Sequence, residues 1–481
     1  MSETLSTQIV VLGAGPGGYA AAFRAADLGR SVVLVDPEEN PGGVCLHRGC
    51  IPSKAYLHAA RLLRETRDAD HYGIKFAEPE IDIARLSAWR SEVVSQLTSG
   101  LAALAKARGV QFVRGRGTFR DAHSLRVDRL GPGQLEIRFE HAIVATGSRP
   151  TVIDSFLPES DRVMTSTGAL ELAGVPDRLL VIGGGYIGLE LGSVYAALGA
   201  QVTVVELEPK LLPGADPDLV RVLEKAIRAR FEAVKTETKV ARLVEGDAGI
   251  TATFENTDGT SEGACFDAVL VAVGRKPNSS GLGLAATSAV IDERGFIEAD
   301  SSGGTAEPSI YAIGDVTGEP MLAHKATHQG LVAAEAIAGR RAAFEPNVIP
   351  AVVFTDPELA WCGLSQAEAK ELGIDAVVAR YPWQASGRAK TLGADAGLTK
   401  LVIDQADDRV IGAGVVGQGA GELIAEAALA IEMGAVASDI AGAIHAHPTL
   451  SETWMEAADV FYGQSVHLYR KRRAARTDKT R

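Results

Sequence analysis

Two stretches of the chain share one pattern of apolar and polar positions. Residues 8–18 (QIVVLGAGPGG) and 179–188 (LLVIGGGYIG) each run from β-branched residues into glycines, and an Ala/Leu-rich segment follows each of them. A second apolar run ends at an acid in both copies, Asp36 and Glu206, and the copies are offset by 170 residues. Each acid stands 23 positions after the first glycine of its loop. Strand, glycine turn, helix and second strand at this spacing predict two dinucleotide-binding βαβ units.

The rest of the chain changes pattern twice. Glycine turns at 145–150 (ATGSRP) and 272–277 (AVGRKP) mark where we expect the chain to leave or enter a nucleotide-binding domain. Beyond residue 278 the pattern predicts new strands and an Ala-rich helix near Ala333. After Pro346 no nucleotide loop occurs, and strand-like runs alternate with a helical one, which predicts a separate α+β domain. The strand-like runs are 351–354, 401–403 and 409–416, and the helical run is 423–433.

Length and charge limit the classes of protein that fit. A chain of 481 residues is too long for one ordinary core, so several domains are expected. The net charge of −13 argues against broad binding to nucleic acid. No run approaches the roughly 18 apolar residues that span a bilayer, so no membrane segment is expected. Residues 470–481 hold seven basic residues and one Asp, a charge of +6 that leaves −19 for the rest. A solvated tail is the favoured interpretation, with a nucleic-acid or membrane anchor as the alternative.

The beginning of the chain and its cysteines indicate a compartment. Residues 1–7 lack the basic region of a signal peptide, and the apolar run after them quickly becomes glycine-rich. Four cysteines in a chain of this size do not resemble a secreted disulfide framework. We therefore expect a cytoplasmic protein, in which a disulfide is more often catalytic than structural.

The glycine loops carry the first chemistry. In the first loop Gly13 permits a tight turn, Gly15 lets backbone approach a pyrophosphate, and Gly18 lets helix and strand pack closely. Asp36 would then accept hydrogen bonds from a ribose. The second loop supplies the same roles for another dinucleotide, through Gly183, Gly185, Gly188 and Glu206. A carboxylate at Glu206 suits the free 2′-hydroxyl of NAD and would repel the 2′-phosphate of NADP. The alternative for each loop is a packing turn.

A pair of cysteines lies in the segment 42–54 (GGVCLHRGCIPSK). A disulfide between Cys45 and Cys50 would close a very short loop and add little stability, so redox chemistry is the better explanation for it. The alternatives are half a zinc site or two inert thiols. No second C-x-x-C lies within reach, so no metal site is expected. Cys265 and Cys362, in apolar surroundings, are expected to be small core residues.

A histidine and a glutamate near the C-terminus offer a base. A thiol with a pKa of about 8.5 is mostly protonated at neutral pH, so an attacking dithiol needs a proton acceptor. His447 and Glu452, five residues apart across a Pro-Thr turn, could form an imidazole–carboxylate pair. Taken alone, such a histidine could equally be a satisfied surface or core residue. His445 is expected to be supporting structure.

From residue 8 to about residue 463 the chain resembles the pyridine nucleotide–disulfide oxidoreductases, through the segment 42–54 and the motif H-P-T-x-x-E at 447–452. The resemblance implies that Cys45 exchanges with substrate and that Cys50 faces a flavin. It also implies that Lys54 lies near the reactive flavin nitrogen and pairs with Glu190. His447 would be the base, oriented by Glu452, and would complete the active site of the partner subunit. The chain is thus expected to be a homodimer with shared sites.

The resemblance also implies the cofactors and the residues that contact them. FAD would be contacted by Gly13, Gly15, Gly18, Asp36, Gly43, Lys54, Gly117, Thr146, Gly147, Asp315, Met321 and Ala323. NAD would be contacted by Gly183, Gly185, Tyr186, Ile187, Gly188, Glu206, Val240, Gly274 and Arg275.

The expected fold class is α/β, with two Rossmann-like domains and a C-terminal α+β dimerisation domain. The expected segments are 1–150 (FAD-binding, first part), 151–277 (NAD-binding), 278–346 (completing the FAD-binding region), 347–470 (interface) and 471–481 (basic tail, expected to be disordered).

Several features favour one branch of the family. Glu206 and the segments 321–330, 354–358 and 382–389 are similar to the NAD-linked members that oxidise protein-bound dihydrolipoamide for 2-oxo acid dehydrogenase complexes. Lipoyl domains of the acyltransferases would then be partners. Tyr186 departs from that branch, where the position is usually aliphatic. The alternatives are an NAD-linked reductase of another small disulfide and a flavin-containing binding subunit without turnover.

Overall fold

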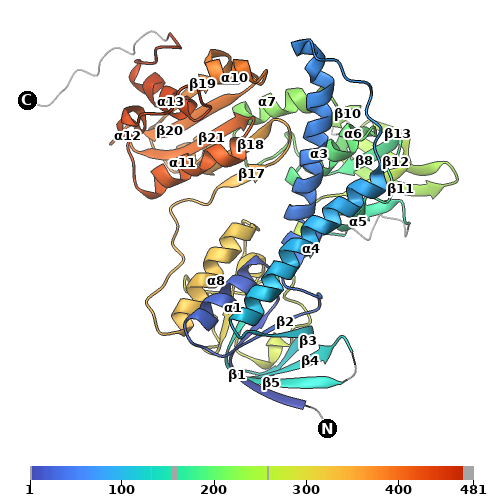
Figure 1. Ribbon diagram of the computed structural model, residues 1–481, viewed down its shortest axis with the longest axis vertical. Helices are drawn as coiled ribbons and strands as arrows, with labels where there is room; N and C mark the ends of the chain where they lie inside the picture. The colour runs from blue at the N-terminus through green and yellow to red at the C-terminus, as the bar shows by residue number, and fades with distance from the viewer. Residues whose placement is uncertain (1–2, 132, 153–159, 257–258, 470–481) are drawn as a thin grey trace, which may run out of the picture. The chain divides into compact units, whose positions relative to one another are not determined.

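The computed structural model describes residues 3–131, 133–152, 160–256 and 259–469. Contacts divide the chain into two compact units, each assembled from two segments (Figure 1). Unit 1 comprises Met1–Val175 and Leu270–Glu345, and unit 2 comprises Pro176–Val269 and Pro346–Arg481. The basic tail at 470–481 falls outside the described residues.

Unit 1 is built on a sheet whose strands are rich in Val, Ile and Leu. Strands β1, β2, β5 and β16 pair in parallel, and such strands are buried on both faces. The far ends of β3 and β5 continue into an antiparallel ribbon with β4. The strands are β1 (Glu3–Leu12), β2 (Val32–Asp36), β3 (Gln111–Asp121), β4 (Ser124–Arg129), β5 (Gln134–Val144) and β16 (Ile310–Ala312), with a separate pair β6 (Ser148–Pro150) and β15 (Arg275–Pro277), and β7 (Val163–Thr165).

Alternate residues of β1 serve two different cores, because successive side chains of a strand point to opposite faces. Ile9 and Val11 pack with residues of α1 and α8, whereas Val10 and Leu12 pack with residues of the β3–β4–β5 ribbon. The parallel sheet is therefore covered on both faces.

Helices α1 and α8 lie side by side (Figure 1). Glycines permit this approach: a Cβ on Gly330 would lie 2.4 Å from the carbonyl oxygen of Gly17. The helical segments of unit 1 are α1 (Pro16–Asp27), α2 (Gly43–Arg48), α3 (Cys50–Asp68), η1 (Ala69–Tyr72), α4 (Ile83–Ala107), α5 (Ser166–Glu171), η2 (Leu284–Ala286), η3 (Gly314–Thr317) and α8 (Ala323–Ile337).

The first part of unit 2 repeats the βαβ pattern of unit 1. Strand β8 leads through a glycine loop into α6, and β9 pairs with β8 in parallel. A meander of three antiparallel strands, β11 to β13, follows. The elements are β8 (Arg178–Ile182), α6 (Tyr186–Ala197), β9 (Gln201–Val205), α7 (Pro217–Arg228), β10 (Ala233–Lys235), β11 (Thr238–Gly246), β12 (Gly249–Asn256), β13 (Ser261–Phe266) and β14 (Ala268–Val271), which crosses the boundary between the units.

The second part of unit 2 is an antiparallel sheet in the order β17-β18-β21-β20-β19. One face packs on α11, α12 and α13 around the buried Trp383 and Trp454 (Figure 1). The other face receives α7, since a Cβ on Gly414 would lie 2.4 Å from Leu219. The elements are β17 (Ala351–Val353), β18 (Glu358–Gly363), α9 (Gln366–Glu371), β19 (Ala376–Pro382), η4 (Trp383–Ala385), α10 (Gly387–Thr391), β20 (Leu398–Asp404), β21 (Val410–Gly417), α11 (Ala420–Glu432), α12 (Ala437–Gly442) and α13 (Glu452–Tyr462).

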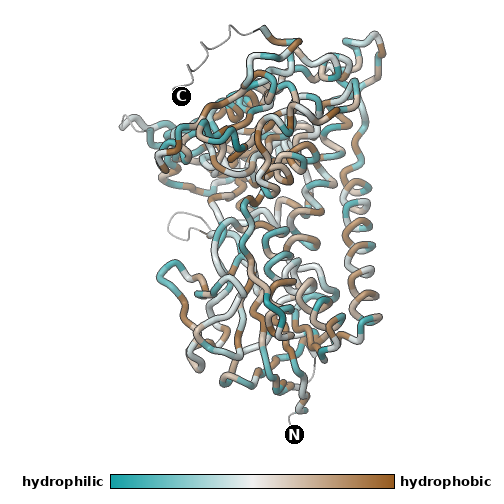
Figure 2. The backbone as a smooth tube through the Cα atoms, turned by 90° about the vertical axis from the view of Figure 1, so that its left-hand side faces the viewer, coloured by the Kyte–Doolittle hydropathy of each residue, from teal (hydrophilic) through white to brown (hydrophobic). Residues whose placement is uncertain are grey.

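The α/β fold class and the C-terminal α+β region are confirmed. Of the new strands expected between residues 278 and 346, only β16 forms among the described residues, together with isolated bridges, because the segment is dominated by turns. Cys362 is buried as expected, whereas Cys265 is only partly buried on the β11–β12–β13 meander. In the described residues no helix is long and apolar enough to cross a membrane, and Figure 2 shows hydrophilic and hydrophobic residues mixed along the helices.

Candidate active site

The first glycine loop connects β1 to α1 with a backbone that only glycine adopts easily. Gly13 has φ +100°, in the region that L side chains avoid. A Cβ on Gly18 would lie 1.8 Å from the carbonyl oxygen of Gly13, so strand and helix pack closely there. At Gly15, by contrast, the nearest atom to such a Cβ is 3.9 Å away, which leaves room for a ligand. This division of roles fits a pyrophosphate at the start of α1.

Asp36, at the end of β2, is buried beside this loop. Its Oδ2 accepts the Ala14 N–H (2.6 Å) and its Oδ1 accepts the Glu38 N–H (2.9 Å). Burial raises the pKa of Asp36, although these two N–H groups oppose the rise. The carboxylate is thus fixed against the loop where a nucleotide ribose would lie.

The second loop reproduces this geometry 170 residues later. Gly183 has φ +109°, and a Cβ on Gly188 would lie 2.2 Å from the carbonyl oxygen of Gly183. Around Gly185 no atom lies within 4 Å of an added Cβ. Glu206 accepts the Gly184 N–H (2.6 Å) and the Glu208 N–H (2.8 Å), as Asp36 does with the matching residues. Both loops therefore have the open glycine and the fixed acid that a dinucleotide requires.

The cysteine pair is held against the first loop. Cys45 lies in the short helix α2 and Cys50 begins α3. A Cβ on Gly43, whose φ is +58°, would lie 2.4 Å from the Cα of Gly15, so the cysteine segment rests on the glycine loop. No disulfide joins the two cysteines in this structure. A hydrogen bond to Cys50, burial, and negative charge on Cys50 raise the pKa of the Cys45 thiol far above its ordinary value.

Sequence reasoning missed several neighbours of this pair. The Arg48 guanidinium pairs with Glu38 (2.5 Å), and His47 Nε2 is 3.0 Å from the carbonyl oxygen of Asn40. These two contacts hold α2 against the loop that precedes it. Burial, and then charge on Cys45 and Cys50, raise the pKa of Tyr19. These contacts join different segments through side chains of unrelated types, and no sequence motif predicts them.

The remaining flavin residues of the prediction are also in unit 1. Asp315 accepts a short hydrogen bond from the Ser148 hydroxyl, and Ser148 also accepts the Arg275 Nε–H (2.7 Å). Thr146 donates to the carbonyl oxygen of Asn278 (2.8 Å). Arg275, expected to contact NAD, is therefore engaged with the ATGSRP turn. Gly147 has a positive φ of +66°, and Gly117 lies inside β3 against Leu12 and Leu125. Ala323 begins α8, and Met321 lies just before it.

Sequence reasoning also missed a buried cation, Lys325, on α8. Its Nζ donates to the carbonyl oxygen of Gly318 (2.6 Å). Burial lowers the pKa of Lys325, against the influence of Asp315 and Glu319.

The other predicted residues are distributed over unit 2. Glu190 is buried in α6 and accepts the Phe354 N–H (2.9 Å). Tyr186, at the first position of α6, is 39% exposed. Ile187 follows it in α6, and Val240 is buried in β11. Because Lys54 belongs to unit 1 and Glu190 to unit 2, their pairing stays a prediction.

His447 and Glu452 form the expected pair. His447 Nδ1 and Glu452 Oε1 are 2.8 Å apart, and Glu452 Oε2 accepts the Thr449 N–H (2.7 Å). Burial alone would raise the pKa of Glu452, but the Thr449 N–H and His447 hold it below its ordinary value. An ionised carboxylate thus orients one ring nitrogen and leaves Nε2 for a reactant. His445 Nε2 lies 2.7 Å from Glu426, in keeping with a supporting role.

No group of three or more side chains in the described part of the chain could hold a metal ion. Unit 1 thus carries one dinucleotide loop with the cysteine pair, and unit 2 carries the other dinucleotide loop and the histidine–carboxylate pair. Two glycine loops with fixed acids, a braced cysteine pair and a histidine–carboxylate pair define a flavin- and pyridine-nucleotide-linked disulfide oxidoreductase.

Comparisons with known proteins agree. Residues 7–330 match the family model of the pyridine nucleotide-disulphide oxidoreductases, and residues 349–458 match the dimerisation domain of the same family. The chain belongs to this family and is an NAD-dependent flavoprotein that uses FAD and NAD. The dimerisation domain makes it a homodimer.

Similar proteins cover almost the whole chain. The dihydrolipoyl dehydrogenase of Vibrio parahaemolyticus is 47% identical over 98% of this chain and 99% of its own length. That of Thermus scotoductus is 46% identical over 96% and 98%. Among solved structures, LpdA from Mycobacterium tuberculosis has a TM-score of 0.88 at 30% identity and covers 95% of this chain and 99% of its own. The flavoprotein disulfide reductase RclA from Escherichia coli has a TM-score of 0.85 at 27% identity, covering 96% and 100%.

Proposed function

We propose that the protein is a dihydrolipoyl dehydrogenase, which oxidises protein-bound dihydrolipoamide to lipoamide and reduces NAD to NADH. The pairing of His447 with Glu452 carries this proposal, because a dithiol substrate must lose its protons to a base. The relatives that span nearly the whole chain at 43–47% identity support the choice of substrate.

The first step is thiol–disulfide exchange at an oxidised Cys45–Cys50 pair. His447 accepts a proton from one substrate thiol, and the thiolate attacks Cys45, breaking the disulfide and leaving Cys50 as a thiolate. The second substrate thiol then displaces Cys45, so lipoamide leaves and two electrons stay on the cysteine pair. A hydrogen bond to Cys50, burial and the negative charge on Cys50 all raise the pKa of Cys45, which favours the proton on Cys45 in the reduced pair.

The cysteine pair must pass its two electrons on. Bound FAD would supply two-electron transfer between the cysteine pair and NAD, so that the disulfide would be regenerated with release of NADH and one proton. Asp36 and the first glycine loop would hold FAD, and Glu206 and the second loop would hold NAD. In segment terms, 1–150 and 278–346 would bind FAD, 151–277 would bind NAD, and 347–470 would form the dimer interface. His447 would then act in the partner subunit's site.

The proposal extends to partners and location. Lipoyl domains of 2-oxo acid dehydrogenase acyltransferases would present the dithiol. We place the protein in the cytoplasm, because glutathione and thioredoxin keep thiols reduced there and a cysteine pair can alternate between its thiol and disulfide forms.

Single substitutions test the mechanism. Cys45→Ser, Cys50→Ser and His447→Gln are each expected to cut dihydrolipoamide–NAD turnover at least ~100-fold, because each removes a group from the exchange step. Flavin content and NADH oxidation by ferricyanide should persist, since neither needs the disulfide. Cys265→Ser, at a half-buried thiol outside the site, is the control. Normal lipoamide turnover in any of the three variants, or faster wild-type reduction of glutathione disulfide by NADPH, would contradict the proposal.

A further inference from the structure

A buried chain of hydrogen bonds runs from the sheet of unit 2 to the turn that carries His447. The Trp383 indole donates to Thr399 Oγ1 (2.9 Å), and Thr399 Oγ1 donates to Thr453 Oγ1 (2.8 Å). Thr453 Oγ1 donates in turn to the carbonyl oxygen of Leu450 (2.7 Å). Trp383, Thr399 and Thr453 are at most 1% exposed, so water does not compete for these bonds.

The direction of the chain is fixed by its first member. An indole N–H can only donate, so the Thr399 hydroxyl accepts from Trp383 and has its own proton left to donate. The Thr453 hydroxyl likewise accepts one bond and donates one. The only member that needs no further partner is the backbone carbonyl of Leu450, where the chain ends.

Trp383, the first member of the hydrogen-bond chain, cannot shift easily. Glycines on two neighbouring segments make room for the Trp383 ring: a Cβ on Gly397 would lie 2.4 Å from it, and one on Gly417 would lie 2.3 Å from it. Since packed interiors leave no free volume for such a ring to move, the indole is a fixed anchor.

Leu450, the last member of the hydrogen-bond chain, lies within the turn that carries His447. Leu450 follows Thr449, whose N–H donates to Glu452. The Leu450 carbonyl oxygen also accepts the Thr453 N–H (3.1 Å). The Thr449 hydroxyl and the Ser451 hydroxyl are 2.9 Å apart in the same turn. The position of the Glu452 carboxylate, and with it the orientation of His447, therefore depends on where Leu450 is held.

We propose that Thr399 and Thr453 are positioning residues for the His447–Glu452 pair, connecting it to the rigid Trp383 anchor. The inference rests on the proposed role of His447 as the base. Loss of the Thr453 hydroxyl removes one of the bonds that hold Leu450 and leaves the Thr399 proton unpaired. Loss of the Thr399 hydroxyl leaves the Trp383 N–H unpaired and disconnects Thr453 from the anchor. A small displacement of a catalytic group is enough to slow a reaction strongly.

The test compares isosteric and hydroxyl-keeping variants of the holoenzyme. Thr399→Val and Thr453→Val are each expected to lower kcat for dihydrolipoamide about 10-fold, with an unchanged KM for NAD. Thr453→Ser should restore most of the rate. NADH oxidation by ferricyanide, which needs both cofactors but not His447, should stay at the wild-type rate in every variant.

A second readout does not need turnover. In NADH-reduced enzyme, the rate at which iodoacetamide alkylates Cys45, followed by peptide mass spectrometry, reports how readily the base removes the thiol proton. We expect Thr453→Val and His447→Gln to slow it, and Thr453→Ser to leave it near the wild-type rate.

Thr355→Val is the matched control, because Thr355 is also buried in unit 2 and its hydroxyl donates to the carbonyl oxygen of Pro357 (2.9 Å). If Thr453→Val behaves like Thr355→Val in both assays while His447→Gln is inactive, the positioning role is wrong and the proposed function stands. If His447→Gln keeps normal turnover and alkylation, the proposed base is wrong, and the positioning role falls with it.

Discussion

Glu206 shows what one residue contributes at the residue scale. It receives two backbone N–H groups at the second glycine loop, the same arrangement that Asp36 makes at the first. The acid could be predicted from sequence, because the βαβ unit sets its distance from the glycines. The bracing of α2 by Arg48 and Glu38 could not be predicted, since that pair follows from the path of a loop and not from a repeat.

Glu206→Arg should exchange the cofactor preference. The variant loses the acceptor for Gly184 and Glu208 N–H groups and gains a cation suited to a 2′-phosphate, so kcat/KM for NAD should fall roughly 10- to 100-fold while that for NADP rises. Glu208→Gln is the control, because Glu208 contributes only its backbone N–H to this contact. Steady-state kinetics with both nucleotides measures the change, and an unaltered NAD/NADP ratio would remove the role given to Glu206.

At the scale of elements, the two βαβ units are the same structure used twice. Their loops match in φ, in the close glycine contact and in the fixed acid, so the repeat predicted both correctly. The Trp383–Thr399–Thr453 chain had no such signal. Thr399 and Thr453 are uncharged and lie 54 positions apart, so they meet only when β20 and α13 pack together.

Matched alanine substitutions should separate the two units. Gly188→Ala forces a Cβ to 2.2 Å from the Gly183 oxygen and should abolish NADH–ferricyanide activity while flavin stays bound. Gly18→Ala, at 1.8 Å from the Gly13 oxygen, should instead yield protein with little flavin. Absorbance spectra and NADH titration distinguish the outcomes.

Gly100→Ala is the control for these glycine variants. It lies within α4 with no atom near the added Cβ, so it should keep both activities and gain up to ~1 kcal/mol of stability. Identical losses in Gly18→Ala and Gly188→Ala would contradict the separate assignment of the loops.

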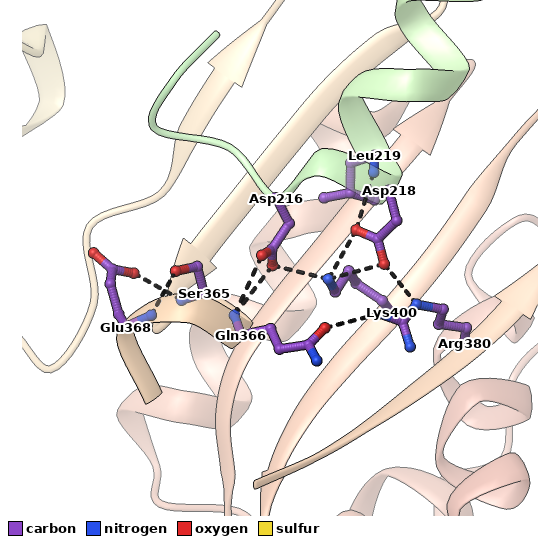
Figure 3. A network of polar contacts seen from close by, with 8 residues as sticks. All are labelled: Asp216, Asp218, Leu219, Ser365, Gln366, Glu368, Arg380 and Lys400. Atoms are coloured by element: carbon purple, nitrogen blue, oxygen red, sulfur yellow. Dashed lines mark hydrogen bonds and ion pairs between the residues drawn. The ribbon is translucent and has the colours of Figure 1, made fainter. Parts of the chain in front are cut away.

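At the scale of the whole molecule, unit 2 is held together by buried charge (Figure 3). Arg380 and Lys400 stand directly opposite each other on β19 and β20, an arrangement in which like charges repel. Asp218 of α7 accepts from both, and Lys400 also pairs with Asp216 (2.9 Å). The cluster therefore joins α7, the helix that follows the second βαβ unit, to the C-terminal sheet.

Lys400→Met should lower the thermal stability of the protein markedly. Lys400 is 1% exposed, and its loss leaves carboxylates that are largely buried, which costs about 3–5 kcal/mol. Differential scanning calorimetry measures the change. Lys225→Met, at an exposed position of α7, is the control and should unfold at the wild-type temperature.

The pH dependence of this loss is a further check on Lys400→Met. Burial would raise the pKa of Asp218, but Lys400 and Arg380 together lower it below its ordinary 3.8. The contribution of the cluster is therefore complete above pH 3.8 and lost as pH falls through the lower, folded-state pKa. The difference between wild type and Lys400→Met should shrink in that range, and a difference independent of pH would show that the lysine acts through packing alone.

Strand β20 links these observations through its alternation. Thr399 and Lys400 are consecutive and point to opposite faces of the sheet. Thr399 belongs to the hydrogen bonds that lead to the turn carrying His447, and Lys400 belongs to the ion cluster with Asp216 and Asp218. A single-residue insertion before them would put the strand out of phase, turning an ammonium group into the tryptophan core and a hydroxyl toward two carboxylates. A two-residue insertion would restore the phase. Outside a β-bulge, an insertion of one residue in this strand is therefore expected to be more disruptive than an insertion of two.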